Sequence, residues 1–390
     1  MINIKSYNNL YEQMISDENI KLAIMRAAKN KRKNNKRHRK LRQIRNEMDK
    51  YIPIVRGWII EYLDRDIQHK PTEINDGISA KKRTIIVPCV AEMLVHHAIV
   101  NVLKPILTQG MYEHSYASIP GRGLHAGVKI TRKWIARNNR HTKYFLKLDI
   151  RKFFDSIDQD VLLAKLQKKI RDKQFFKYIE KVVRTTKSGI PLGFTTSQWF
   201  ANFLLTELDH LIKEDWGVKH YIRFMDDMVL FGSNKRELHR IKDKIEKYLN
   251  QVLHLQLKGN WQVVFLDSTK SRKKKGHFLD FLGFKFYRNH VGLRGKIALK
   301  AQRKAKRISK KPRANVMDAR QMIVYAGFMK YADCYDWFHD HISPYVSIKQ
   351  MREIVSRYDS RQATKQTKKK KEKHKTNNDN KGVIVNECVV

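Results

Sequence analysis

The chain has 390 residues, 42% of them hydrophobic, which is enough for a substantial core divided among two or three domains. Its 81 Lys and Arg against 38 Asp and Glu give a net charge of +43, and the resulting self-repulsion predicts a polyanionic partner. Three cysteines without metal-ligand spacing, no signal peptide and no apolar run of membrane-spanning length argue against a secreted disulfide scaffold or a membrane protein, so we expect a cytoplasmic protein.

Residues 1–50 are predicted to form a basic helical arm. Apolar residues recur at helical spacing in its first half, at Leu10, Met14, Leu22 and Met25. Residues 29–42 then carry nine Lys or Arg, one His and no acid. Such a stretch is either a solvated charge run or a helix that binds RNA or DNA, and the large total charge gives the two interpretations equal weight.

A basic stretch, residues 80–88, leads into a strand and is followed by a helix over residues 91–107. It is either a basic edge strand that resists aggregation or a site where cations neutralise the charge on a leaving pyrophosphate. Farther on, the glycine-rich turn of residues 118–125 precedes a helix over 126–136, and the amide groups at that helix start would suit a phosphate. By itself, the Gly-Arg-Gly sequence in this turn is a weak signal and most often marks only a loop.

The run from residue 144 to residue 154 predicts a strand that carries a functional carboxylate. With a period of two, Asp149 falls on a mostly polar face, opposite the face formed by Tyr144, Leu146, Leu148 and Ile150. The acids that follow, Asp155 and Asp158, are predicted to form the turn and the N-cap of a helix over 159–170. Asp149 is therefore the candidate functional acid of this strand.

Two apolar runs, residues 221–225 and 228–232, flank the adjacent acids Asp226 and Asp227 and predict a β-hairpin. A turn of two acids is unfavourable, because like charges repel and hairpin turns prefer Asn-Gly or Asp-Gly. The pair is therefore either a solvated acidic turn or a cation site. Together with Asp149 it has the composition that two-metal phosphoryl transfer requires, in which hard oxygen ligands hold two Mg²⁺ ions roughly 4 Å apart.

The second half of the chain is predicted to be strongly basic. Between Lys258 and Arg313 we count 18 Lys or Arg against two Asp, with aromatic residues interleaved, a composition suited to a nucleic-acid duplex or single strand. Two helices follow over residues 296–311 and 318–331. The Lys-rich residues from 364 onward are predicted to be disordered.

These ordered motifs resemble those of bacterial reverse transcriptases, in particular the enzymes of diversity-generating retroelements and related, often antiviral, groups. Residues 224–227 (Phe-Met-Asp-Asp) match the family's Tyr-X-Asp-Asp box with Phe in place of Tyr, and residues 148–154 match the first palm box. Residues 190–198 resemble the diversity-generating form of the next box, since most other reverse transcriptases have Gln at the position of Leu192 and Pro at that of Gln198. The resemblance extends from about residue 74 to residue 358 and includes a primer-grip sequence at 281–284.

The resemblance implies an α+β right-hand polymerase with fingers, a palm built on an antiparallel sheet, and a helical thumb. It assigns residues 51–292 to the fingers and palm and residues 293–360 to the thumb. Residues 1–50 remain the basic N-terminal helical arm, and residues 361–390 a Lys-rich disordered tail.

Site residues are also implied. Asp149, Asp226 and Asp227 form the catalytic trio and, with Ile150, hold two Mg²⁺ ions, for which Mn²⁺ can substitute. The implied nucleotide-binding residues, with Lys81 and Lys270 as alternatives at the basic positions, are Arg83, Lys82, Phe154, Leu192, Gly193 and Lys258. The implied nucleic-acid-binding residues are Arg122, Gln198, Phe281, Leu282, Gly283, Arg303, Lys304 and Arg307.

Three of these residues have specific expected roles. Phe154 would crowd the sugar 2′ position and favour DNA as product, unless it is ordinary core packing. Lys258 is the candidate general acid for pyrophosphate release, unless it is a solvated surface residue. The resemblance links Leu192, which cannot hydrogen-bond as the usual Gln does, to error-prone copying.

The expected reaction is RNA-templated DNA synthesis from dNTPs on a DNA or RNA primer. Two biological roles compete: mutagenic copying of a template repeat with a small basic accessory protein, and antiphage defence with a dedicated noncoding RNA. A catalytically silent RNA-binding protein is the alternative from another class, and the retained acidic trio argues against it.

Overall fold

The computed structural model describes residues 6–29, 36–75, 82–138, 140–266 and 276–376. The chain divides into two compact units, and the first contains Met1–Leu282 and Tyr287–Asn289. The second contains Gly283–Phe286 and His290–Val390. Strands and helices are mixed within the first unit, so the predicted α+β class is confirmed.

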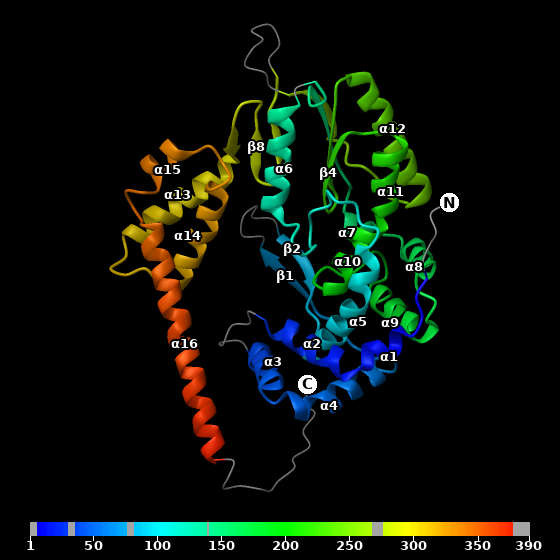
Figure 1. Ribbon diagram of the computed structural model, residues 1–390, viewed down its shortest axis with the longest axis vertical. Helices are drawn as coiled ribbons and strands as arrows, with labels where there is room; N and C mark the ends of the chain where they lie inside the picture. The colour runs from blue at the N-terminus through cyan, green and yellow to red at the C-terminus, as the bar shows by residue number, and fades with distance from the viewer. Residues whose placement is uncertain (1–5, 30–35, 76–81, 139, 267–275, 377–390) are drawn as a thin grey trace. The chain divides into compact units, whose positions relative to one another are not determined.

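A four-stranded antiparallel sheet lies at the centre of the first unit. Its strands follow the order β4-β5-β3-β6, with bounds His220–Phe224, Asp227–Gly232, Tyr144–Asp149 and Gln262–Phe265. Leu146 and Leu148 on β3 are buried, whereas Asp149 stays partly exposed at the end of the strand, as the period-two pattern predicts. Two helices, α6 (Leu124–Arg137) and α12 (Lys235–Val252), contact this sheet (Figure 1).

Short helices connect β3 to β4. In chain order they are α7 (Phe153–Ser156), α8 (Gln159–Gln167), α9 (Lys173–Val183), α10 (Thr195–Leu204), α11 (Thr206–His210) and the single π-helical turn η2 (Leu211–Asp215). The Asp158 side chain accepts hydrogen bonds from the amides of Asp160 and Val161, which confirms the predicted N-cap of α8.

The N-terminal helices belong to the core of the first unit. They are α1 (Leu10–Ile15), α2 (Asp17–Ala28), α3 (Lys36–Asn46), α4 (Met48–Ile60) and the 3₁₀ turn η1 (Glu61–Leu63). Helix α2 packs on α5 (Val90–Thr108) through a fully buried face that includes Ile20, Ala23, Ile24 and Ala27. The apolar face of helices α1–α4 is therefore part of the common core, and the boundary of the arm at residue 50 stays a prediction.

The strongly apolar helix α5 corrects one expectation. An 18-residue window in Val90–Thr108 is apolar enough to cross a membrane by length and composition, so the prediction that no such run exists is wrong. In the structure 67% of that window is buried against the rest of the unit, and core helices pass the same test. Before α5 lies an exposed antiparallel hairpin of β1 (Pro71–Asn75) and β2 (Lys82–Ile86).

The second unit is mainly helical. A hairpin of β8 (Phe284–Phe286) and β9 (Val291–Leu293) precedes α13 (Gly295–Ser309), α14 (Val316–Met329), α15 (Tyr335–His341) and α16 (Ile348–Thr376). Asp318 of α14 is buried and accepts hydrogen bonds from Lys304 at 2.7 Å and Lys311 at 2.6 Å. This ion-pair cluster ties α14 to the end of α13.

Helix α16 also revises the predicted tail. The disordered segment was expected from residue 361, but the helix continues to Thr376. Lys, Glu, Gln and Ala are favourable helix formers, which explains why a charge-rich composition did not exclude a helix here. The remaining tail residues lie outside the described part of the chain, as do the alternatives Lys81 and Lys270.

Candidate active site

The acidic hairpin forms with a register one residue away from the prediction. Phe224 pairs with Asp227, so the two-residue turn is Met225–Asp226 rather than the two acids. This register moves Asp227 onto strand β5, which removes one of the like charges from the turn. Met225 takes up the turn instead, with a φ of 59°, in the left-handed region that non-glycine residues rarely occupy.

Two of the three acids lie close together. Asp149 ends β3, and its carboxyl group is near enough to that of Asp226 to disfavour the ionised form of Asp226. Burial and the neighbouring Asp149 charge together raise the pKa of Asp226 to about 6. Asp227 lies opposite Asp149 in the β3–β5 register. Acids from two distant segments of the sequence are therefore brought to one end of the sheet.

Two lysines partly neutralise these acids. The Lys258 ammonium donates to Asp149 Oδ1 at 2.6 Å, and its backbone amide donates to the Asp149 carbonyl at 2.8 Å. The Lys147 ammonium lies 3.7 Å from Asp227 Oδ2 and donates to the Asp280 carbonyl at 2.6 Å. Lys147 lies two residues before Asp149, on the same face of β3, and was not among the predicted site residues.

The acids fit a divalent cation in part. The contact between Asp149 and Asp226 is repulsive when both are ionised, and a cation would relieve that repulsion. Within the described ranges, however, no group of three or more His, Cys, Asp or Glu side chains is already arranged as a metal site. Ile150 is fully buried and bridges to Leu257, so only its backbone could serve as a ligand.

The loop of residues 190–194 is bound to strand β2. The Ile86 amide donates to the Leu192 carbonyl at 2.7 Å. A Cβ added at Gly193, where φ is 111°, would lie 2.2 Å from the Ile86 carbonyl oxygen. The close approach at Gly193 is therefore made by the protein's own backbone, and the nucleotide-binding role of this glycine stays a prediction.

Phe154 lies beside the same loop. It packs against Phe153 with ring centroids 5.6 Å apart, and its carbonyl accepts from the Ile190 amide at 2.8 Å. The ring is partly buried against the core, so core packing accounts for part of its environment. A role at the nucleotide sugar stays a prediction.

The other predicted contacts to nucleotide and template lie at the surface of the first unit. Lys82 and Arg83 are exposed on β2, and the Lys82 ammonium is 3.2 Å from Glu73. Arg122 is half-buried and donates to the Tyr112 carbonyl at 2.9 Å, which stabilises its own loop. Gln198 is exposed on α10.

The segment predicted as the primer grip, residues 281–284, is divided between the two units after Leu282. Phe281 is fully buried at the end of β7 (Leu279–Phe281) in the first unit, and Leu282 has a φ of 54°. In the second unit, a Cβ on Gly283 would lie 2.9 Å from Ile297 Cδ1.

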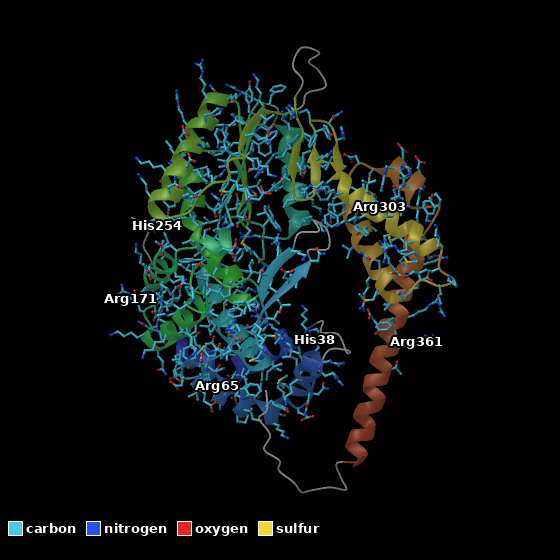
Figure 2. All side chains as sticks on the ribbon, turned by 180° about the vertical axis from the view of Figure 1, so that it is seen from behind. His38, Arg65, Arg171, His254, Arg303 and Arg361 are labelled. Carbon is cyan, nitrogen blue, oxygen red and sulfur yellow. The ribbon has the colours of Figure 1, made fainter. Side chains whose placement is uncertain are left out.

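Two of the three predicted contacts on α13 are exposed. Arg303, labelled in Figure 2, and Arg307 are solvent-accessible. Lys304 is instead engaged with buried Asp318, so its charge stabilises the second unit internally.

Two buried residues next to the hairpin were not among the predicted site residues. Arg223 on β4 is fully buried and pairs with buried Asp209 of α11. A charged residue inside the apolar run Tyr221–Phe224 was the available signal, because an Arg on a central strand needs a buried partner.

The comparison with known families identifies this arrangement. Residues 68–286 match the model of the family described as reverse transcriptase (RNA-dependent DNA polymerase). The chain belongs to the reverse transcriptase family. The predicted family resemblance is confirmed at this level, and the matched range includes all three acids.

The relatives of this reverse transcriptase family member are distant. Protein YkfC of Escherichia coli strain K12 is 21% identical over 253 residues, which cover 54% of this chain and 64% of YkfC. The retron Ec73 reverse transcriptase of Escherichia coli is 24% identical over 183 residues, covering 44% of this chain and 55% of the relative. The chain thus spans less than two thirds of the length of these relatives. Among solved structures, apo telomerase from Candida tropicalis is similar with a TM-score of 0.46 and 14% identity, covering 80% of this chain and 69% of that one.

Proposed function

We propose that this protein is an RNA-directed DNA polymerase of a small bacterial or phage retroelement. The observation that carries the proposal is the meeting of Asp149 and Asp226 at the end of the antiparallel sheet, with Asp227 opposite Asp149. The family match over residues 68–286 supports the same chemistry.

The protein's groups have separate roles in this reaction. Asp149 and Asp226 would hold two Mg²⁺ ions, with Asp227 contributing charge. Bound divalent ions supply activation of the primer 3′-hydroxyl and neutralise the leaving pyrophosphate. The Lys258 ammonium donates a hydrogen bond to Asp149, and from this position it would deliver a proton to the leaving pyrophosphate.

The right-hand polymerase architecture is part of the proposal. The four-stranded sheet would be the palm, the β1–β2 hairpin with Lys82 and Arg83 the fingers, and α13 and α14 the thumb. Arg303 and Arg307 would then contact the phosphates of a primer–template duplex, because exposed cations on one helix suit a polyanion.

For the biological role we favour error-prone copying, as in diversity-generating retroelements, with a small basic accessory protein. Leu192 and Gln198 in the 190–198 box support it. Antiphage defence with a dedicated noncoding RNA is the competing role, and similarity to a retron reverse transcriptase favours it. Sequencing the cDNA made on a defined RNA separates the two, because only the first predicts substitutions concentrated opposite template adenine.

Purified protein with Mg²⁺, dNTPs and a primed RNA tests the polymerase proposal. Asp226→Ala should abolish incorporation and leave RNA binding intact. Asp243→Asn, which changes an exposed acid on α12, is the matched control and should retain full activity. Incorporation by the Asp226→Ala protein at the wild-type rate would remove the catalytic assignment, and RNA binding without incorporation by wild type would indicate the silent RNA-binding alternative.

A further inference from the structure

A buried charged network lies directly beneath the acidic turn. The Arg223 guanidinium is inaccessible to solvent, as are the side chains of Asp209 and Tyr221. Arg223 Nε donates to Asp209 Oδ1 at 2.8 Å, and Arg223 NH1 donates to Asn202 Oδ1 at 3.1 Å. The Tyr221 hydroxyl donates to the same Asp209 oxygen at 2.6 Å. Four side chains from β4, α10 and α11 therefore satisfy one another in the core.

Fold stability alone is a poor explanation for this network. Burying an ion pair carries a desolvation penalty that its attraction often fails to exceed, and well-packed apolar residues can replace such pairs without loss of stability. The charges are therefore better explained by a contact that an apolar side chain cannot make.

Arg223 makes such a contact with the turn. Its NH1 also donates to the Met225 carbonyl oxygen at 3.0 Å. That carbonyl belongs to the planar peptide group that joins Met225 to Asp226, so holding the oxygen fixes the plane from which the Asp226 backbone departs. Because Met225 has a φ of 59°, its conformation is intrinsically unfavourable and persists only while its surroundings hold it.

The guanidinium is itself held from both sides. Asp209 lies on α11, and Asn202 lies on α10, where its amide donates to the Ala117 carbonyl at 2.9 Å. Outside the network, the Arg223 backbone bonds to the segment at His114 and Tyr116, which fixes the free edge of β4. The planar guanidinium group has several N–H donors and can satisfy all these acceptors at once, whereas a lysine ammonium cannot.

We propose that Arg223 is a positioning residue for catalysis, which holds the strained Met225–Asp226 turn so that the Asp226 carboxyl group meets Asp149. Asp209 and Asn202 orient its guanidinium. This inference rests on the proposed polymerase function and adds a determinant of its rate that does not touch substrate.

The test separates positioning from folding by replacing both partners of the Arg223–Asp209 ion pair together. Tyr221→Phe is the parent variant, since its hydroxyl contacts Asp209 but not the turn, and it should polymerise as wild type does. Adding Asp209→Leu and Arg223→Met to that parent replaces the ion pair by apolar side chains and leaves no buried charge. We expect the triple variant to retain its thermal transition and RNA binding. Its kcat should fall on the order of 100-fold, the loss that about 1 Å of misplacement causes, with little change in the KM for dNTP.

A rescue variant tests the mechanism. Glycine occupies positive φ without strain, so Met225→Gly in the triple variant should recover a large part of the lost kcat, because the turn then needs no clamp. A folded triple variant with kcat equal to that of its Tyr221→Phe parent would refute the proposal, and so would a failure of Met225→Gly to raise kcat.

If the triple variant does not fold, Arg223→Lys decides the question. It keeps the buried charge beside Asp209 but cannot also reach the Met225 carbonyl, so kcat should fall at least tenfold in a folded protein, equivalent to about 1.4 kcal/mol. An Arg223→Lys protein with wild-type kcat contradicts the proposal. Wild-type protein that incorporates no nucleotide on primed RNA contradicts the polymerase function instead, so the two failures are distinguishable.

Discussion

Replacing Gly193 by alanine should loosen the attachment of strand β2 to the loop of residues 190–194. The new methyl group would lie 2.2 Å from the Ile86 carbonyl oxygen, a backbone atom that cannot rotate away. Either the strand shifts or the 2.7 Å hydrogen bond from the Ile86 amide to the Leu192 carbonyl breaks, at about 1 kcal/mol. The φ of 111° adds roughly 1–2 kcal/mol of backbone strain. The reduced entropy of the unfolded chain returns less than about 1 kcal/mol, so the net loss should be about 2 kcal/mol.

Thermal unfolding measures this loss, and the melting temperature of the first unit should fall by about 5 °C. Gly217→Ala is the matched control, because Gly217 also has a positive φ, of 65°, but has no atom within 4 Å of the added methyl group. The difference between the two variants reports the contact with Ile86 together with the difference in backbone strain between φ values of 111° and 65°. If Gly193→Ala is no less stable than Gly217→Ala, the close approach does not stabilise the protein and the reasoning fails.

Three further predictions concern charge and shape elsewhere. Burial would raise the pKa of Asp318, but hydrogen bonds from two lysines lower it from 3.8 to about 2, so its stabilisation is complete above pH 4 and is lost as the pH falls towards 2. Urea unfolding should show about 2 kcal/mol of acid-dependent loss that is absent in Asp318→Asn. Phe154→Ala should raise UTP incorporation relative to dTTP by at least about tenfold if the ring crowds the 2′-hydroxyl, and an unchanged ratio assigns the ring to the core. Lys258→Met should reduce the Mg²⁺ concentration for half-maximal activity, because the ammonium competes for Asp149, while lowering kcat; an increased Mg²⁺ requirement would argue against that competition.

Periodicity predicted which residues face the core where burial depends on the pattern of a single strand or helix. It placed Asp149 on the accessible face of β3, and the acid-flanking apolar runs gave β4 and β5. It did not give the turn register, since a shift of one residue depends on the pairing of Phe224 with Asp227 and not on composition. In α2, Leu22 and Met25 belong to the helical spacing that predicted a helix here, but they are 37% and 55% exposed.

Contacts between distant segments could not be predicted from local patterns. Ile86 and Gly193 approach each other across about a hundred residues of chain, and nothing near either residue identifies its partner. The same applies to Arg223 and the Met225 carbonyl, because a two-residue separation in sequence leaves the side-chain direction open. The family motifs located the acids, whereas the groups that hold them in place emerged only from the fold.

The packing of α2 on α5 has a consequence for biosynthesis. Helix α5 is the most membrane-like segment among the described residues, and the helix that covers it is encoded upstream. A ribosome releases the N-terminus first, so the covering helix has already left the exit tunnel when α5 emerges. The nascent chain therefore already contains the helix that covers α5. Without that helix, α5 would be the described segment most prone to associate with lipid or with other nascent chains.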